Sequence, residues 1–207
     1  LADRERESFI RDIYDGTLSV KQEIPTALRP TLLAHCRRAN PKRARILEQI
    51  VANTGSLLPR HFWPKLTVLG VWTGGSVSAY LPRLKEFYGD ATFRDHGLSA
   101  SEGRMTIPLT AETSSGMLDF PHSYFEFIPE NEQGSTDPTI LEGHELTPGQ
   151  NYFVLLTTSS GFYRYNIHDV VECTGFQGEA PLLKFLHKGA HFSSITGEKI
   201  SEFQVAS

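Results

Sequence analysis

Residues 66–103 read LTVLGVWTGGSVSAYLPRLKEFYGDATFRDHGLSASEG, and this stretch decides the predicted fold class. It begins with a dense apolar run of strand length that ends at the glycines of WTGGS, a pattern typical of buried parallel strands. The pattern then predicts a helix over 79–88 and a second strand over 91–98. A β-α-β unit of this kind brings both strand ends to one edge of a sheet, where ligands bind in open α/β folds. The loops TGGS (73–76) and SASEG (99–103) are therefore candidate site loops.

Upstream of this unit, the first third of the chain predicts helices. Apolar residues recur at helical spacing between Arg4 and Tyr14, and Gly16 follows as a C-terminal cap. A second helix is expected after Pro30. A third is expected to begin at Asn40, with a proline in its first turn, and to end before Gly55.

Downstream, the sequence is richer in strands that are separated by polar connections containing Gly, Ser, Asp and Pro. The predicted strands are residues 123–128, 151–157, 162–165, 170–174 and 182–186. The predicted fold class is thus α/β, with a helical N-terminal part, a β-α-β unit of a mostly parallel sheet, and a strand-rich β-hairpin region.

Composition limits the classes of function. The 207 residues suit one domain, or one domain with a small appendage, and a net charge of -4 gives no electrostatic attraction to nucleic acid. No apolar stretch reaches the roughly 18 residues of a spanning helix, and the first residues are charged rather than signal-like. Two cysteines, Cys36 and Cys173, agree with a reducing compartment. We therefore expect a cytoplasmic protein with no nucleic-acid or membrane partner.

The first candidate motif is GLSASEG, residues 97–103. Its small side chains would let a base or a phosphate approach the backbone, and its hydroxyl groups can meet phosphate oxygens. Glu102 would hold the Mg²⁺ ion that accompanies a nucleotide. The alternative is an ordinary polar turn, since short Ser/Gly clusters are common.

The second candidate motif is FYRYNIHDVV, residues 162–171, in which Asp169 lies between two predicted strands. A carboxylate fixed at a strand end can accept hydrogen bonds from both hydroxyl groups of a ribose. The alternative is that His168 and Asp169 form a hairpin turn and that Arg164 is a paired surface charge.

These two motifs, with WTGGS upstream and GEKISE (197–202) downstream, resemble the Gretchen Hagen three family of acyl-acid amido synthetases, and the chain is similar to a bacterial-type homologue. This auxin-responsive family belongs to the superfamily of adenylate-forming enzymes. The four segments have the family's order and similar separations over roughly residues 8–203. The resemblance implies a ligase that uses ATP and Mg²⁺, forms an acyl-AMP from a small carboxylic acid, and transfers the acyl group to an amino acid or a thiol.

The resemblance also implies the site residues. Glu102 and Lys188 are expected to act in catalysis: Glu102 is the expected magnesium ligand, and Lys188 lies near the position of a family arginine close to the interdomain hinge. The residues expected to bind ATP or AMP are Thr73, Gly74, Gly75, Ser99, Ala100, Ser101, Tyr163 and Asp169.

Two departures from the family pattern shape the expected domain organisation. His168 stands where the family usually has glycine, and no Ser/Thr/Gly-rich phosphate loop precedes WTGGS. We therefore expect a fragment, inactive alone, in which residues 1–186 are the central part of the adenylate-forming N-terminal domain and residues 187–207 are the hinge and the start of a truncated C-terminal domain. Two rivals remain open: a non-catalytic nucleotide-binding or interaction module of the same fold, and a transferase for another nucleotide.

Overall fold

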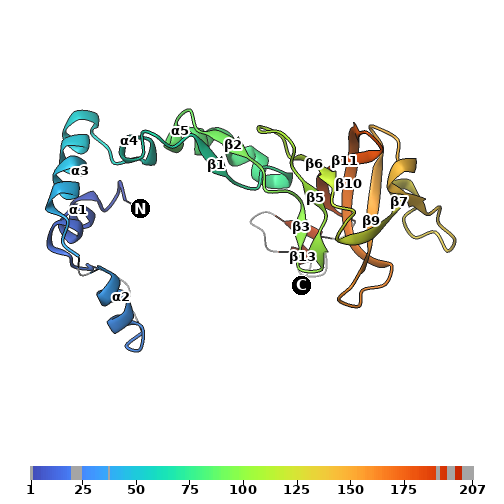
Figure 1. Ribbon diagram of the computed structural model, residues 1–207, viewed down its shortest axis with the longest axis horizontal. Helices are drawn as coiled ribbons and strands as arrows, with labels where there is room; N and C mark the ends of the chain where they lie inside the picture. Colours follow the sequence, from blue (N-terminus) through green and yellow to red (C-terminus); the bar gives the residue numbers. More distant parts are fainter. Residues whose placement is uncertain (1, 20–24, 37, 190–191, 195–198, 202–207) are drawn as a thin grey trace. The chain divides into compact units, whose positions relative to one another are not determined.

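The computed structural model describes residues 2–19, 25–36, 38–189, 192–194 and 199–201 (Figure 1). The chain divides into two compact units. The helical unit comprises Leu1–Leu66 and Leu84–Asp90, and the sheet unit comprises Thr67–Arg83 and Ala91–Ser207. Each unit has a hydrophobic core of its own.

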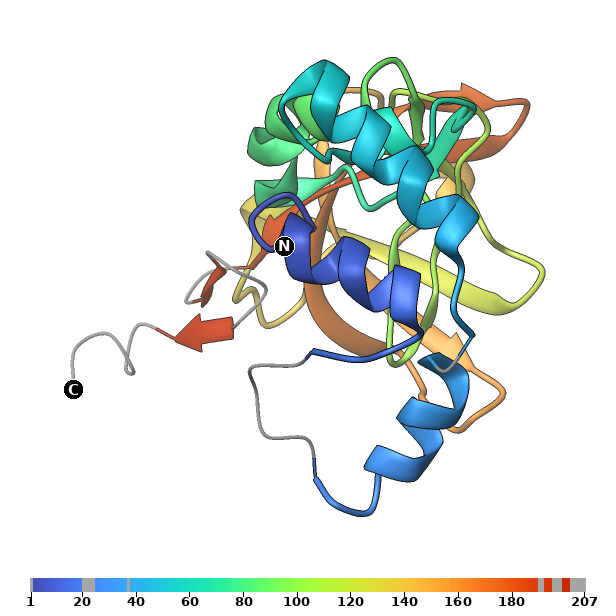
Figure 2. The same cartoon turned by 90° about the vertical axis from the view of Figure 1, so that its left-hand side faces the viewer.

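The helical unit contains α1 (Arg6–Asp15), α2 (Arg29–Cys36), α3 (Pro41–Thr54) and α4 (Pro59–Phe62). Helices α1 and α3, dark blue and cyan in Figures 1 and 2, pack together and bury Ile10 against Leu47 and its neighbours. The caps are those that the sequence predicts: the side chain of Asn40 accepts a hydrogen bond from the Arg43 N–H, and Gly16 and Gly55 end α1 and α3 in the left-handed conformation. In the described part of the chain, no helix combines the length and apolar character that crossing a membrane requires.

The predicted β-α-β unit is confirmed. Strands β1 (Val68–Gly70) and β2 (Thr92–Arg94) pair in parallel, and the connection runs through the 3-10 helix η1 (Gly75–Tyr80) and helix α5 (Leu81–Tyr88). In the described residues this parallel sheet has two strands, and Val68 is 51% exposed. The prediction of a buried strand is thus wrong for β1, because an apolar run indicates a strand but not what covers it.

The strand-rich region forms a seven-stranded sheet in the order β5-β6-β11-β10-β9-β7-β8, and every pairing in it is antiparallel. The predicted strand 170–174 lies within one long strand, Tyr165–Gln177, whereas the predicted strand 162–165 is wrong except for its last residue. The strands are β5 (Thr106–Ile107), β6 (Ser115–Leu118), β7 (Ser123–Pro129), β8 (Leu141–Glu142), β9 (Asn151–Thr158), β10 (Tyr165–Gln177) and β11 (Ala180–Lys188). Two short 3-10 helices, η2 (Glu130–Glu132) and η3 (Gly143–Glu145), follow β7 and β8.

Two further pairs of short strands complete the sheet unit. Strands β3 (Ser99–Ala100) and β4 (Gly103–Arg104) form a hairpin, and β12 (Phe192–Ser194) pairs with β13 (Lys199–Ser201). The GEKISE motif extends from 197 to 202, and half of it, residues 197, 198 and 202, lies outside the described residues. The predicted hinge in this part of the chain stays a prediction.

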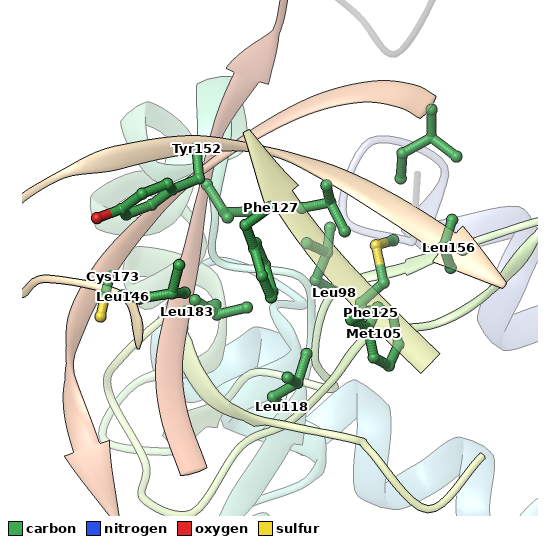
Figure 3. Packing of buried hydrophobic residues seen from close by; sticks show 13 residues of the cluster. Leu98, Met105, Leu118, Phe125, Phe127, Leu146, Tyr152, Leu156, Cys173 and Leu183 are labelled. Carbon is green, nitrogen blue, oxygen red and sulfur yellow. The ribbon is translucent and has the colours of Figure 1, made fainter. Parts of the chain in front are cut away.

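The core of the sheet unit anchors the β3-β4 hairpin. Leu98 directly precedes the hairpin and Met105 directly follows it, and both are buried in the hydrophobic cluster shown in Figure 3, which also contains Leu156 of β9. The backbone N–H of Met105 donates to the carbonyl oxygen of Leu98 at 2.9 Å. The candidate loop SASEG is therefore held at its base by apolar burial on both sides.

Candidate functional site

The SASEG segment is a β-hairpin whose turn is Ser101-Glu102. Ser99 pairs with Arg104 and Ala100 with Gly103, so the side chains of the turn stand at the tip of the two short strands. Ser101 is exposed, and Glu102 is half-buried. The segment is thus a polar turn, as the alternative interpretation expected. Its base is anchored because Leu98 and Met105, which flank the hairpin, are buried in the core of the sheet unit.

A buried carboxylate joins the two candidate loops. One carboxylate oxygen of Asp95, Oδ2, accepts hydrogen bonds from the Thr73 backbone N–H and the Thr73 hydroxyl, each at 2.6 Å. The other, Oδ1, accepts from the Gly97 N–H at 2.7 Å. Thr73 belongs to TGGS and Gly97 begins GLSASEG, so Asp95 holds the starts of both predicted motifs.

Asp95 was not among the residues predicted from the sequence. A carboxylate two residues before a glycine is a known signal for a turn, because Asp accepts from the N–H two residues on. That signal does not reveal the bond to Thr73, which lies 22 residues away. The contact depends on the parallel pairing of β1 and β2, which brings both strand ends to the same edge.

The glycines of WTGGS are required by close packing. The Trp72 and Phe185 rings lie 5.7 Å apart, and the loop crosses the face of Phe185 in β11. Gly75 has a φ of +57°, and a Cβ atom there would lie 3.3 Å from the Phe185 ring. At Gly74 a Cβ atom would lie 2.8 Å from Nε1 of Trp72. The predicted loop is therefore bound closely to the β11 strand.

A cavity of about 670 Å³ adjoins Thr73, which is one of its lining residues. This volume suits a small organic molecule, because ligand pockets typically span about 300–1,000 Å³. Its lining combines apolar side chains with hydroxyl groups, and the lining residues other than Thr73 are Leu81, Phe93, Leu109, Thr110, Glu112, Thr113, Ser114, Ser115, Thr174, Gln177, Leu182 and Lys184.

Asp169 lies within β10, at an irregularity of the strand. The register against β9 shifts between Asn166 and Val170, and His168 has a φ of 58°. The His168 N–H donates to the side-chain oxygen of Asn166 at 2.8 Å. Asp169 is therefore in a β-bulge. The hairpin-turn alternative is wrong for His168 and Asp169, and so is the expectation that a strand ends there, because residues 165–177 form one continuous strand.

The structure brings Asp169 together with Lys188, the residue predicted near the hinge. The two face each other in the β10-β11 pairing, and the Lys188 ammonium lies 2.5 Å from Oδ1 of Asp169. The same ammonium donates to the carbonyl oxygen of Ile167 at 2.8 Å. Both side chains are largely buried. Lys188 therefore fastens the bulge that carries the predicted ribose ligand.

The next residue, Gly189, closes this arrangement. Its N–H donates to the carbonyl oxygen of His168 at 2.6 Å. A Cβ atom at Gly189 would overlap the ring of Phe153, a buried residue of β9. Strands β9, β10 and β11 are thus packed tightly around Asp169.

The residues that precede β10 are on the surface. Tyr163, predicted to bind the nucleotide, is 79% exposed. Arg164 forms an ion pair with Glu126 at 2.9 Å, which confirms the interpretation of Arg164 as a paired surface charge. The neighbouring Phe162 and Tyr165 rings lie 4.9 Å apart. An exposed Tyr163 is available for stacking on a base.

The donor groups fit a magnesium ion that arrives with a nucleotide rather than one held by the chain. Among the residues that the structure describes, no three His, Cys, Asp or Glu side chains lie where they could jointly hold a metal ion. Mg²⁺ in nucleotide sites is commonly bound by one or two carboxylates together with substrate phosphates. A single carboxylate at a turn, such as Glu102, satisfies that requirement.

Cys173 is not a nucleophile candidate. Burial raises the pKa of the Cys173 thiol above its ordinary value, so the thiol stays protonated at neutral pH. Cys173 lies in the hydrophobic core of the sheet unit.

We expect the His168→Gly variant to be more stable than the His168→Ala variant by about 1 kcal/mol. A residue with a Cβ atom costs about 1–2 kcal/mol in the left-handed region, and glycine avoids this cost. Part of the advantage is offset because glycine loses more backbone entropy on folding. Both variants lack the imidazole, so their difference isolates the backbone conformation. Urea unfolding followed by circular dichroism measures it. An alanine variant as stable as the glycine variant would argue against strain at this position.

Comparisons with known proteins identify the family of the chain. The model of the GH3 family N-terminal domain matches residues 1–93, and that of the GH3 family central domain matches residues 116–188. An indole-3-acetic acid-amido synthetase of Arabidopsis thaliana, GH3.10, is 30% identical over 92% of this chain and 35% of its own length. Another, GH3.2, is 27% identical over 96% of this chain and 38% of its own length.

A jasmonoyl–L-amino acid synthetase of Nicotiana attenuata, JAR4, is 27% identical over 95% of this chain and 35% of its own length. Solved structures of the GH3.15 acyl acid amido synthetase share the fold: one has a TM-score of 0.72 at 22% identity, and its complex with 2,4-DB has 0.75 at 23%, each covering 97% of this chain and 35% of the other. The chain thus spans roughly a third of the length of these relatives.

Proposed function

The chain belongs to the GH3 family, and from this premise we propose that it carries part of the nucleotide site of an ATP-dependent acyl acid amido synthetase. In this proposal, a carboxylate oxygen of a small acid attacks the α-phosphate of ATP and releases pyrophosphate. The amine of an amino acid, or another nucleophile, then attacks the acyl-adenylate and displaces AMP. The acid and the accepting nucleophile are left unspecified.

The observation that carries the proposal is the linkage of the two candidate loops. Thr73 and Gly97 are joined through Asp95 where two parallel strands end, the usual place of a ligand site in an α/β fold. The hairpin tip with Ser99 and Ser101 follows directly from this junction. Hydroxyl and backbone N–H groups at such an edge suit the adenine and α-phosphate of a nucleotide.

Each remaining residue has a role in holding the reactants. Asp169 would accept hydrogen bonds from the ribose hydroxyl groups, and Lys188 would hold its carboxylate in place. Glu102 would hold the Mg²⁺ ion that accompanies ATP. When bound, this ion would neutralise part of the phosphate charge. Tyr163 would stack on the base, and the cavity beside Thr73 is our candidate for the acid. No residue in this scheme acts as a general base, because catalysis rests on positioning and charge neutralisation.

The relatives support the type of reaction. Those named above are indole-3-acetic acid-amido synthetases and a jasmonoyl–L-amino acid synthetase, and the solved relatives are acyl acid amido synthetases. The bulge at His168 also supports it: histidine adopts here the left-handed backbone that glycine favours, so the local geometry does not require glycine. That removes one argument for a non-catalytic module. The cytoplasmic location, the exclusion of nucleic acid and membranes, and the domain boundary at 187 stay predictions.

The complete polypeptide encoded by the reading frame is expected to exchange labelled pyrophosphate into ATP in the presence of a suitable carboxylic acid. Asp169→Asn is expected to weaken AMP binding at least about tenfold, since a lost hydrogen bond to a charged group is worth about 1.5–3 kcal/mol. Calorimetry with AMP measures the affinity. Asp137→Ala, which alters an exposed carboxylate in a surface loop, serves as the control.

The outcomes separate the enzyme from its rival. If a broad panel of carboxylic acids supports no exchange while AMP still binds, adenylation is abandoned and the binding-module alternative is adopted. If neither exchange nor AMP binding is detected in the folded polypeptide, the nucleotide site itself is wrong.

A further inference from the structure

We propose that Asp95 is a positioning residue that holds the TGGS loop and the SASEG hairpin at one fixed separation, so that both meet the same nucleotide. This inference deepens the proposed function and rests on it. Asp95 would not touch the nucleotide. It would act through Thr73, at the start of one loop, and through Gly97, at the start of the other.

The chemistry of the junction requires a carboxylate. Three donors converge on Asp95: two N–H groups and one hydroxyl group, at 2.6 to 2.7 Å. An ionised carboxylate is acceptor-only and can accept all three, whereas an asparagine would present an NH₂ group to at least one of these donors. Asp95 is only 4% exposed, so water cannot easily replace a lost partner.

The position of Asp95 explains why a side chain, rather than the backbone, links the two chains here. The parallel ladder between β1 and β2 continues one step beyond the strands, where the Val71 N–H donates to the carbonyl oxygen of Arg94 at 3.0 Å. After that step the two chains diverge into their loops. The Asp95 side chain then supplies the next link between them, at Thr73.

A second side chain fixes the path from the junction to the hairpin. The hydroxyl oxygen of Thr106 accepts from the Leu98 N–H at 2.8 Å, and Thr106 is fully buried in β5. Residues 95–98 are thus held by one side chain at each end. A displacement of Asp95 would therefore be transmitted to both site loops rather than absorbed by a flexible connection.

Two other hydrogen-bonded carboxylates in the described part of the chain, Glu112 and Asp119, differ from Asp95 because they bond to residues outside both candidate loops. The Glu112 carboxylate accepts from the Phe93 N–H at 3.0 Å and borders the edge of β2. Asp119 binds His122 at 2.7 Å, beside β6. Neither of these bonds joins the two candidate loops. The feature that singles out Asp95 is that its bonded partners belong to both predicted nucleotide motifs.

The first test measures amide hydrogen exchange in the complete polypeptide and needs no nucleotide. Asp95→Asn is expected to raise exchange at least about tenfold in both 72–76 and 96–102, since each segment loses its anchor. The control is Leu146→Ala, a core variant of the sheet unit that lowers stability at a residue outside both loops. An increase in one segment only, or an equal increase in the control, would overturn the linkage.

Thr73→Val provides a milder variant if Asp95→Asn does not fold. It removes only the hydroxyl donor and keeps the backbone N–H bond to Asp95. Because the carboxylate is shared, exchange is expected to rise in 96–98 as well as in the segment that contains residue 73. If the increase stays within 72–76, Asp95 does not couple the loops.

The second test measures AMP binding by calorimetry. Asp95→Asn is expected to raise the Kd for AMP at least about tenfold, because misplacement of binding groups by about 1 Å can cost up to a hundredfold. Leu146→Ala should leave the Kd unchanged, since a smaller folded fraction lowers the number of sites but not their affinity. An unchanged Kd in Asp95→Asn would overturn the positioning role and leave the proposed function intact. A wild-type polypeptide that binds no AMP would instead overturn the proposed function, and the positioning role with it.

Discussion

Gly97→Ala is expected to lower the free energy of unfolding by about 3 kcal/mol, because the backbone conformation and a steric overlap both disfavour a side chain at this position. Gly97 has a φ of +90°, and a Cβ atom there would overlap the carbonyl oxygen of Thr106 in the adjacent strand. Left-handed backbone in a residue with a Cβ atom costs about 1–2 kcal/mol, and forcing extra volume into a packed region costs about 1–3 kcal/mol. Neither partner can yield easily, because the obstructing atom is backbone.

Gly149→Ala is the matched control for that experiment. Gly149 has a φ of +82°, nearly the same as Gly97, but no heavy atom lies within 4 Å of the position of its Cβ. This variant should lose only about 1–2 kcal/mol, the cost of the backbone conformation. Urea unfolding of both variants measures the difference, which reports the clash with Thr106. Equal losses would show that the β5 strand moves aside to accommodate a methyl group.

Lys188→Met is expected to destabilise the chain by about 3 kcal/mol, because it removes the charge that balances a largely buried carboxylate. The ammonium also donates to the carbonyl oxygen of Ile167, so the variant loses a second bond. The double variant Asp169→Asn, Lys188→Met should recover much of this loss, since it leaves no buried charge. A double-mutant cycle in urea at neutral pH measures the coupling between the two residues.

Lys184→Met provides the comparison for an exposed pair. Lys184 lies 3.7 Å from Glu172, also between β10 and β11, but both side chains are more accessible to solvent. Removing its charge should cost less than about 1 kcal/mol, as is usual for surface pairs. If Lys188→Met cost no more than Lys184→Met, Lys188 would not be fastening the bulge at Asp169.

Local signals in the sequence predicted the helical part well. The Asn40 cap, the following proline and the glycines after α1 and α3 act within one helical turn, so their effect on the backbone can be deduced from neighbouring residues. Strands β7, β9, β10 and β11 of the antiparallel sheet were also predicted, since their apolar and aromatic residues alternate with turn-forming segments, whereas the short strands β5, β6 and β8 were not. Burial of β1 was not predictable, because a strand pattern does not say what packs against it.

The sequence predicted which segments belong to the candidate site, but not which of their residues are in contact. Thr73, the SASEG hairpin, Asp169 and Lys188 were all named from the sequence, and the structure adds which of them are in contact. Asp169 and Lys188 are bonded across two strands. Whether Glu102 holds a metal, and whether Tyr163 binds a base, stay predictions.

The sequence by itself determined helices α1, α2, α3 and α5, the longer strands of the antiparallel sheet and the motifs that resemble one family, because these depend on residue type and on short spacings. Only the tertiary structure decided that β10 is one bulged strand, that Lys188 balances Asp169, and that Asp95 joins the β-α-β unit's two loops. The physical reason is distance along the chain. The Asp95 bond to Thr73 spans 22 residues, and hydrogen bonds of that range exist only after strands have paired and excluded water.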